Sequence, residues 1–426
     1  MAVISLLALV FVIVLGVMRN KNIGIIALAA ALLLAIFGGL STSDIIGGFP
    51  TSLFLNLFGM FFFFSIAQAN GSLDLLSKKV FQKLAGIKAI YPLMVFIIAG
   101  LITLIDPGGL TSYVVLPIIT MSIGFQMGYN PVLIGALTIY GSNSTLMTPV
   151  GVFGTIARDL VAQNGYPDFT LQIILNGYVM FSIGVILTYV AYRGWKTSSL
   201  NNGTISIEQT GAVNLDNLPE FNSKQKITLV NLALMIAMVI GLGTHAGLTA
   251  LVFSIVLLVL DCADEEEAFN GVPWGTIFIV VGIGNLLGVI ELLGGLDLLA
   301  ELLASLASRW TVAPILGITS SVMSFISLAM AGPVPALLPT IDSRNTSIGN
   351  PFHPVELIST IINGGFTAAI SPLSMGGAMV MAAYGTLFKP DAAERNKVFK
   401  QLLTIAVVVS IIQGLIANTG IYSLFI

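Results

Sequence analysis

The chain has 426 residues, of which 56% are hydrophobic and 9% are charged, and its net charge is −3. Soluble domains carry about 25% charged residues, so this composition excludes an ordinary soluble protein and indicates a chain that lies largely in a lipid bilayer. The single cysteine, Cys262, excludes an intrachain disulfide. Because the only histidines are His245 and His353, the sequence also disfavours a histidine-based metal site or catalytic triad.

Apolar segments predict five membrane spans in each half of the chain. In the first half they lie near residues 3–18, 23–40, 51–69, 131–157 and 170–192, and in the second half near 227–243, 246–260, 273–291, 354–387 and 402–424. Residues 1–17 have neither a basic start nor a small-residue cleavage site, so we expect a retained span and not a signal peptide.

A further apolar stretch lies between the third and fourth spans of each half, at residues 91–126 and 312–341. Proline and glycine interrupt each stretch near its middle. The resulting arms are too short to cross a bilayer comfortably, since a crossing helix needs about 20 residues. We therefore expect two re-entrant helical hairpins, each of which enters and leaves the membrane on one side.

The two halves are related by a repeat with a constant offset of 223 residues. Gly-Ser-Leu-Asp-Leu-Leu at 71–76 returns as Gly-Gly-Leu-Asp-Leu-Leu at 294–299, and the same offset pairs Gly59 with Gly282, Gly141 with Gly364 and Thr148-Pro149 with Ser371-Pro372. Because each copy has an odd number of spans, the second copy must be inverted relative to the first. We therefore predict an all-α polytopic membrane protein made of two inverted repeats of five transmembrane helices, each repeat with one re-entrant hairpin and one broken helix.

The predicted organisation places the first repeat at residues 1–193, a polar cytoplasmic linker at 194–226 and the second repeat at 227–426. With both termini outside, all but three of the basic residues lie on the inner side, as the positive-inside rule requires. Residues 72–85 place their leucines on one helical face and carry Lys78, Lys79 and Lys83, the pattern of an amphipathic helix on the inner, anionic leaflet. The corresponding helix near 295–309 is acidic. We expect both to be amphipathic connectors.

Four helix breaks, two in each copy, are the strongest candidates for a functional site. They lie at residues 106–112, 141–151, 331–335 and 364–374. A break frees backbone N–H groups that favour an anion at a helix N-terminus, and carbonyl oxygens that can bind a cation. We predict substrate-binding positions at Gly108, Gly109, Thr111, Ser142, Asn143, Thr145, Gly332, Gly365, Thr367 and Ser371, and sodium-binding positions at Asp106, Ser144, Thr148 and Ser374.

Glycine, proline and hydroxyl residues in membrane helices often serve only packing or kinks. Matched breaks in two inverted copies favour a transport site instead. Asp106 fits a cation or proton site and a helix cap equally well. For Asn56 and Asn285 we expect helix–helix hydrogen bonds. For Asp342, Arg344 and Glu356 we expect solvated positions at the outer surface, and we assign no role to His353.

Three N-terminal segments carry a family resemblance: residues 6–19, Gly-Gly-Phe-Pro-Thr-Ser-Leu-Phe-Leu at 47–55, and Ile-Ala-Gln-Ala-Asn-Gly-Ser-Leu-Asp-Leu-Leu at 66–76. On these the chain resembles the ion transporter superfamily, and within it the MatC-like dicarboxylate (malonate or C4-dicarboxylate) carriers. It is also similar to the divalent anion/sodium symporters. The resemblance implies the bacterial inner membrane, a scaffold domain that forms a homodimer, and a transport domain that moves.

The chain departs from those symporters at the residues that contact substrate and sodium. Counting back from Leu116-Pro117 puts Pro107-Gly108-Gly109 where the symporters carry Ser-Asn-Thr, and Gly332-Pro333-Val334 also lacks that signature. Residues 142–145 resemble it but belong to a broken span. The symporters' individual contacts are therefore not carried over. No arginine or lysine lies in a predicted break, which favours a bound cation that offsets the substrate's charge.

We therefore predict a secondary active transporter, a cation-coupled symporter of small organic anions such as C3 or C4 dicarboxylates, that works by alternating access with Na⁺ or H⁺. The alternative is the large membrane subunit of a binding-protein-dependent organic-acid transporter. An intramembrane enzyme is disfavoured because no catalytic cluster is present, and a channel because two hairpins favour alternating access. We expect no nucleic-acid partner. The pocket chemistry fits malonate, malate, succinate or a monocarboxylate.

Overall fold

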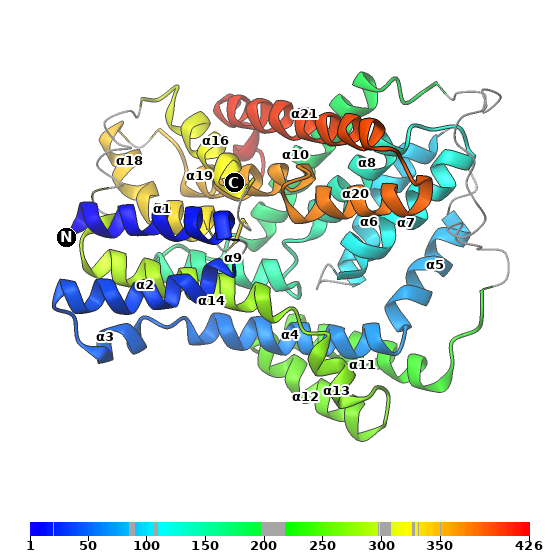
Figure 1. Ribbon diagram of the computed structural model, residues 1–426, viewed down its shortest axis with the longest axis horizontal. Coiled ribbons are helices and arrows are strands. Elements are labelled where there is room, and N and C mark those ends of the chain that lie inside the picture. Colours follow the sequence, from blue (N-terminus) through cyan, green and yellow to red (C-terminus); the bar gives the residue numbers. More distant parts are fainter. Residues whose placement is uncertain are drawn as a thin grey trace.

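The computed structural model describes residues 1–19, 21–84, 90–105, 110–196, 218–296, 298, 308–325, 329–330, 332–349 and 351–426. These residues fold almost entirely into helices and contain no β-strand (Figure 1). The predicted all-α fold is therefore confirmed for the part of the chain that is described.

The helices follow one another in a similar order in the two halves. The first half holds α1 (Ala2–Arg19), α2 (Ile23–Gly38), α3 (Thr42–Gly47), α4 (Thr51–Ala69), α5 (Ser72–Leu84), α6 (Tyr91–Ile105), α7 (Leu110–Gln126), α8 (Pro131–Thr145), α9 (Val152–Gln163) and α10 (Thr170–Ala191). The second half holds α11 (Ser223–Leu242), α12 (Ala246–Val259), α13 (Glu265–Asn270), α14 (Trp274–Leu292), α16 (Val312–Ser324), α17 (Pro333–Leu337), η2 (Leu338–Thr340), α18 (Ile341–Ser347), α19 (Pro354–Thr367), η3 (Ala368–Ile370), α20 (Met375–Phe388), α21 (Ala392–Ile416), η4 (Ala417–Thr419) and η5 (Ile421–Ser423).

The helices form two groups that lie one above the other in Figure 1. In the lower group α2 packs against α14 and α4 packs against α12, with α1, α11 and α13 alongside. In the upper group α8 packs against α6, α7 and α10, and α19 packs against α16 and α21. Contacts of α4 with α9 and of α14 with α17 join the two groups. The broken helices therefore belong to one body and the first helices of each half to another.

Glycines bring the helices of the lower group into backbone contact. A Cβ on Gly24 of α2 would lie 1.8 Å from the carbonyl oxygen of Phe278 in α14, and a Cβ on Gly282 of α14 would lie 2.1 Å from the oxygen of Gly24. In the other pair, a Cβ on Gly59 of α4 would lie 2.0 Å from the oxygen of Gly247 in α12. Small residues allow this approach, which supports helix association in lipid. Gly24 and Gly247, like Gly59 and Gly282, stand 223 positions apart, so the two helix pairs use equivalent glycines.

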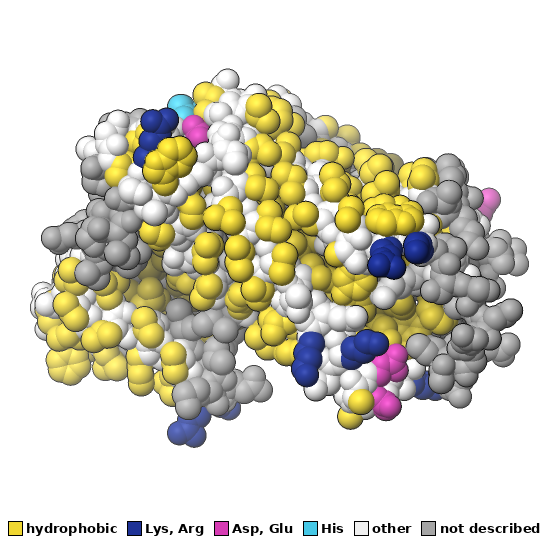
Figure 2. All heavy atoms as spheres, turned by 90° about the horizontal axis from the view of Figure 1, so that it is seen from above, with side chains coloured by type: hydrophobic (Ala, Val, Ile, Leu, Met, Phe, Trp, Pro, Cys, Tyr) yellow, Lys and Arg dark blue, Asp and Glu magenta, His cyan; other side chains and the backbone are white. Residues whose placement is uncertain are grey.

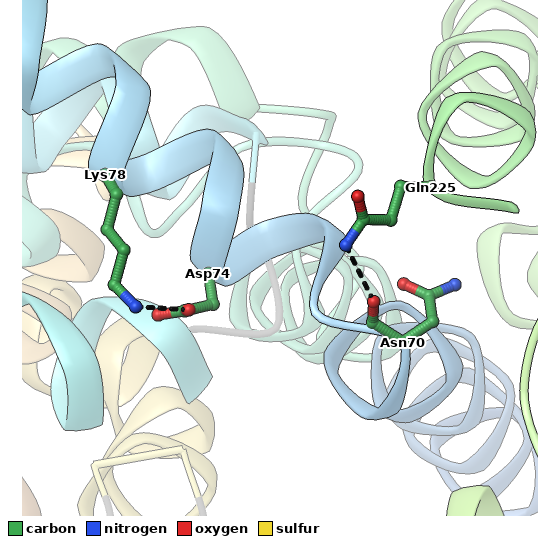
Figure 3. Close-up of polar contacts among 4 residues, drawn as sticks. All are labelled: Asn70, Asp74, Lys78 and Gln225. Atoms are coloured by element: carbon green, nitrogen blue, oxygen red, sulfur yellow. Dashed lines mark hydrogen bonds and ion pairs between the residues drawn. The ribbon is translucent and has the colours of Figure 1, made fainter. Parts of the chain in front are cut away.

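The turn between α4 and α5 holds the first helix of the second half. The side-chain amide of Gln225 on α11 donates to the carbonyl oxygen of Asn70 at 3.0 Å (Figure 3), and the Asn70 amide donates to the Thr228 hydroxyl at 2.7 Å. One turn further along α5, Lys78 and Asp74 form a half-exposed ion pair at 2.7 Å. Such an i, i+4 pair contributes only about 0.5 kcal/mol to stability. The amide contacts of Asn70 therefore do more to hold the start of α11 against the turn between α4 and α5.

The surface is apolar where α21 is exposed. Figure 2 shows a face covered largely by hydrophobic side chains, with lysine and arginine confined to a few small groups. Along α21, Val407, Ile411 and Leu415 follow one another at every fourth position, and each is at least 38% exposed. Such a face suits lipid and not water. By length and composition α10, α21 with η4, and the span from α19 to α20 can each cross a membrane.

The breaks in the fourth span of each half are observed where they were predicted. The first span stops at Thr145 and resumes at Val152, and the second stops at Thr367 and resumes, after one turn of 3₁₀ helix, at Met375. The helices α6 and α16, which were predicted as the first arms of the two hairpins, are also short. At about 1.5 Å per residue, α6 with 15 residues and α16 with 13 residues fall short of a bilayer about 30 Å thick.

Several local features were not expected from the sequence. The short helices α3, α13 and α18 were not predicted, and α11 starts at Ser223, inside the expected linker, because Asn222 and Gln225 form a capping box. Glu356 is not a solvated surface residue: it is 8% exposed, and its carboxylate accepts from the backbone N–H of His353, the N-cap of α19. The predicted helix 72–85 is confirmed as α5, whereas most of the segment 295–309 lies outside the described residues.

Candidate substrate site at the two broken helices

Asn143 connects three elements at the centre of the upper group. Its side-chain oxygen accepts a hydrogen bond from the Tyr113 hydroxyl on α7, and its side-chain amide donates to the carbonyl oxygen of Phe366 on α19 at 3.2 Å. Asn143 is only 2% exposed. Phe366 stands 223 positions after Asn143, so it is the equivalent residue in the repeat. The two broken helices therefore touch at equivalent positions, and α7 joins them there.

Both breaks fold back onto a glycine two residues into the next helix. A Cβ on Gly154 of α9 would lie 1.9 Å from the carbonyl oxygen of Thr148, and a Cβ on Gly377 of α20 would lie 2.2 Å from the carbonyl oxygen of Ser371. Both distances are far below van der Waals contact, so only glycine fits either position. Gly154 and Gly377 are again 223 positions apart, as are Thr148 and Ser371. The two breaks therefore have the same local geometry.

Each break ends at a helix N-terminus that has no side-chain cap. The N-cap residue of α9 is Gly151, which has no side chain, and that of α20 is Ser374, whose side chain accepts no bond from the helix. Val152 and Gly376, at the start of these helices, are buried. Helix N-termini carry a partial positive charge and free N–H groups, and they bind anions readily. The site thus offers two equivalent N-termini.

Among the predicted site residues whose side chains are described, only Thr148 has a hydroxyl that is buried without a partner. It lies in the first break at 5% exposure, has no hydrogen bond, and would be 2.9 Å from a Cβ on Gly151, the N-cap of α9. An unpartnered buried hydroxyl costs about 1–3 kcal/mol. A ligand that binds at this N-terminus would supply the missing partner.

Four other hydroxyls of the breaks already donate to backbone carbonyls. Ser142 donates to Thr138, Ser144 to Gly141 and Thr367 to Gly364, all within their own helix. Thr145 instead donates to Gly100 on the first hairpin arm at 2.8 Å. Their oxygens can still accept a bond or bind a cation. In the second break, the Ser371 oxygen accepts from the N–H of Leu373.

Each break also packs against the segment where its half was predicted to form a hairpin. Gly100 of α6 lies against Ser144 and Thr145, and on the other side a Cβ on Gly365 would be 2.7 Å from the Cβ of Ala329 beside the second hairpin tip. Gly332 starts the return arm α17.

Some predicted positions cannot be placed. Asp106, Gly108 and Gly109 lie outside the described residues, and of Thr111 only the backbone, in α7, is described. Among the described residues, α8 packs against α6, α19 packs against α16, and the two broken helices meet at Asn143 and Phe366.

Four residues of this site were not expected from sequence. Tyr113 and Phe366 have no local signal, because their contacts with Asn143 join distant segments. Gly154 and Gly377 do have a signal in the sequence, since the offset of 223 that revealed the repeat also pairs these two glycines. Asn56 makes the expected helix–helix hydrogen bond, because its side-chain oxygen accepts from Gly247 on α12 at 3.0 Å. The same expectation is wrong for Asn285, whose side-chain oxygen is buried without a partner.

A polar cluster links the two helix groups near the start of α4. The carboxylate of Asp159 on α9 accepts from the amide of Asn56 at 2.6 Å and from the hydroxyl of Ser52 at 3.4 Å, and Ser52 lies 3.3 Å from the His245 ring. Asp159 lies beyond the predicted span. Burial raises the pKa of this carboxyl, an effect that the Asn56 hydrogen bond and the nearby His245 partly offset. Because the pKa is raised in the folded protein, this carboxyl makes the folded state less stable as the pH rises from its ordinary pKa through the raised one.

A cavity of about 410 Å³ lies beside this cluster, between the two helix groups. Its wall includes Ser52 and Gly48 near the start of α4, Glu291 on α14, and Met330 next to the second hairpin tip. The cavity therefore extends from the start of α4 and the end of α14 to the predicted helix break at residues 331–335.

Comparison with known proteins agrees with this arrangement. Residues 1–145 match the family model described as the N-terminus of the dicarboxylate carrier protein MatC, which confirms the resemblance seen in the sequence. No curated protein matches the chain.

Two solved structures share its fold. Neisseria gonorrhoeae MtrF, described within a class of antimetabolite efflux pumps, is 13% identical with a TM-score of 0.56 over 93% of this chain and 84% of its own. The Alcanivorax borkumensis YdaH transporter is 11% identical with a TM-score of 0.56 over 89% of this chain and 87% of its own.

Proposed function

We propose that this chain, a membrane transporter and not an enzyme, whose first third is that of the MatC dicarboxylate carriers, moves a C3 or C4 dicarboxylate together with a cation by alternating access. The observation that carries the proposal is the pair of N-termini, of α9 and α20, that lack a side-chain cap at equivalent breaks, the first buried and the second partly exposed. A dicarboxylate has two charged ends, and two N-termini give each end a set of free N–H groups.

The absence of cationic side chains from the described residues of the breaks supports cation coupling. Helix N-termini carry only about half a charge each, so a bound dianion would remain incompletely neutralised. Na⁺ binds hydroxyl and carbonyl oxygens. The oxygens of Thr148 and Ser144 in the first break and of Ser374 in the second suit it, and Asp106 would complete the set. A proton carried with the substrate is the alternative coupling ion.

The proposed fold has two inverted repeats, which account for the equivalent glycine contacts in the two halves. It also has a transport domain that moves. Equivalent glycines join α2 to α14 and α4 to α12, and equivalent glycines shape both breaks. In the proposed cycle the upper group moves against the lower group, whose broad exposed surface would form the homodimer. The Asp159–Asn56 hydrogen bond joins the two groups, so it would break during that movement.

The proposal is tested by exchange transport in proteoliposomes that contain only this purified chain. Vesicles preloaded with unlabelled malonate or succinate are expected to accumulate the radiolabelled compound in sodium buffer, with saturation, and at least tenfold less in choline buffer at constant pH. Equal exchange in choline that depends on pH would replace sodium with protons.

Three other outcomes would contradict the proposal. Exchange that does not saturate would indicate a channel. Absence of any exchange, with binding of the carboxylate intact, would favour the membrane subunit of a binding-protein-dependent system. Absence of both would overturn the substrate class.

A further inference from the structure

A second cavity, of about 510 Å³, lies between α10 and α21, away from the broken helices. Both helices are long and apolar enough to cross a membrane, so the cavity faces lipid. Its wall along the middle of α21 is hydrophobic, with Ile405 and Val408, and Leu187 faces them from α10. Val408 is 46% exposed, so this wall is accessible from outside the protein.

The other end of the cavity is basic. Lys397 and Lys400 line it from the first turns of α21 and stand three positions apart, so they project from one face of the helix. Both are exposed, and neither has an ion pair among the described side chains. The acidic residues nearby are engaged elsewhere: Asp391 caps α21, and Glu394 accepts from the Tyr384 hydroxyl at 2.8 Å.

The ligand must therefore be anionic at one end and apolar along the rest. A soluble dicarboxylate or inorganic phosphate would satisfy the lysines but leave the hydrophobic wall uncovered. A lipid satisfies both parts at once, because its acyl chain lies along the hydrophobic wall within the bilayer while its charged head group reaches the lysines. Basic pockets between membrane helices on the cytoplasmic side bind anionic head groups, and the charge pattern of the sequence places Lys397 and Lys400 on that side.

We propose that the groove between α10 and α21 binds an anionic phospholipid of the inner leaflet, with its phosphate on Lys397 and Lys400 and an acyl chain along Leu187 and Val408. The volume fits a head group and the first part of one chain, since ligand sites commonly measure about 300–1,000 Å³. Binding here is independent of the substrate site and requires no transport activity.

The test uses native mass spectrometry of the purified, full-length protein in mixtures of phosphatidylglycerol and phosphatidylcholine. It measures how many molecules of each lipid the protein retains, and the ratio of the two numbers gives the lipid preference. The wild type is expected to prefer phosphatidylglycerol at least fivefold. The double variant Lys397→Gln and Lys400→Gln is expected to lose that preference. Val408→Trp, which fills the groove, is expected to reduce retention of both lipids.

The matched control is the double variant Lys224→Gln and Lys226→Gln. These lysines are also exposed, lie in the first turn of α11 and do not line the groove, so the lipid preference is expected to stay unchanged. Unchanged preference in the Lys397 and Lys400 variant would overturn the proposal. So would displacement of the lipid by millimolar inorganic phosphate, since that result would identify a simple anion site.

Discussion

Gly377→Ala is expected to abolish transport. The added Cβ would lie 2.2 Å from two backbone carbonyl oxygens, those of Ile370 and Ser371, so the second break would have to open. Overpacking of this kind costs about 1–3 kcal/mol or more, and here it also displaces the N-terminus of α20. We expect uptake in proteoliposomes to fall at least a hundredfold. Gly154→Ala is expected to do the same at the first break, where the Cβ would lie 1.9 Å from the Thr148 oxygen.

Gly385→Ala is the matched control on the same helix. A Cβ there would meet only the end of the flexible Arg395 side chain, at 3.5 Å. Alanine is favoured over glycine within a helix by about 1 kcal/mol, so this variant is expected to be slightly more stable and to transport normally. Normal uptake by Gly377→Ala, or equal losses in Gly377→Ala and Gly385→Ala, would contradict the role assigned to the breaks.

Asn143→Ala is expected to be the second most damaging substitution. It would leave the Tyr113 hydroxyl and the Phe366 carbonyl buried without this partner, at a cost of about 1–3 kcal/mol for each group. The two broken helices would lose their direct polar link. We expect at least a tenfold loss of uptake and a lower unfolding temperature, measured on the same purified sample.

A double-mutant cycle distinguishes the specific coupling between Tyr113 and Asn143 from the general cost of losing a buried hydrogen bond. Tyr113→Phe removes only one of the partners, and its effect on stability should not add to that of Asn143→Ala. Ser254→Ala on α12 is the control, because that buried hydroxyl bonds only to Ala250 in its own helix. Additive effects of Tyr113→Phe and Asn143→Ala would show that the contact does not couple the two residues.

The positions of the helix breaks could be predicted because their cause is local. Pro149 and Pro372 lack the backbone donor that a continuing helix needs, and glycines flank both. Because the repeat pairs the two breaks, the signal for each break also supported the prediction of the other. The residues that hold the breaks together could not be found in this way. Tyr113 and Asn143 are separated by 30 positions and lie on different helices, and no periodicity specifies that contact.

Charge was a less reliable guide than backbone chemistry. Glu356 was expected in water because it is charged, yet it is buried where its carboxylate completes a helix cap with His353. The spacing of a capping residue and Glu three positions later was visible in the sequence, but histidine at the N-cap obscured it. Asn56 was expected to bond another helix, and it does so. Its second partner, Asp159, is a charged residue of the other helix group and had no signal in the sequence.

The central claim is that the uncapped helix N-termini at the breaks bind a dicarboxylate together with a cation. It is tested most directly by the unfolding temperature of the purified protein with mono-, di- and tricarboxylates, in sodium and in choline, for the wild type and for Thr148→Val. A C3 or C4 dicarboxylate is expected to raise that temperature in sodium only, as selective binding to the folded state requires, and Thr148→Val should lose most of the shift. No shift with any carboxylate, or an equal shift in Thr148→Val, would contradict the account.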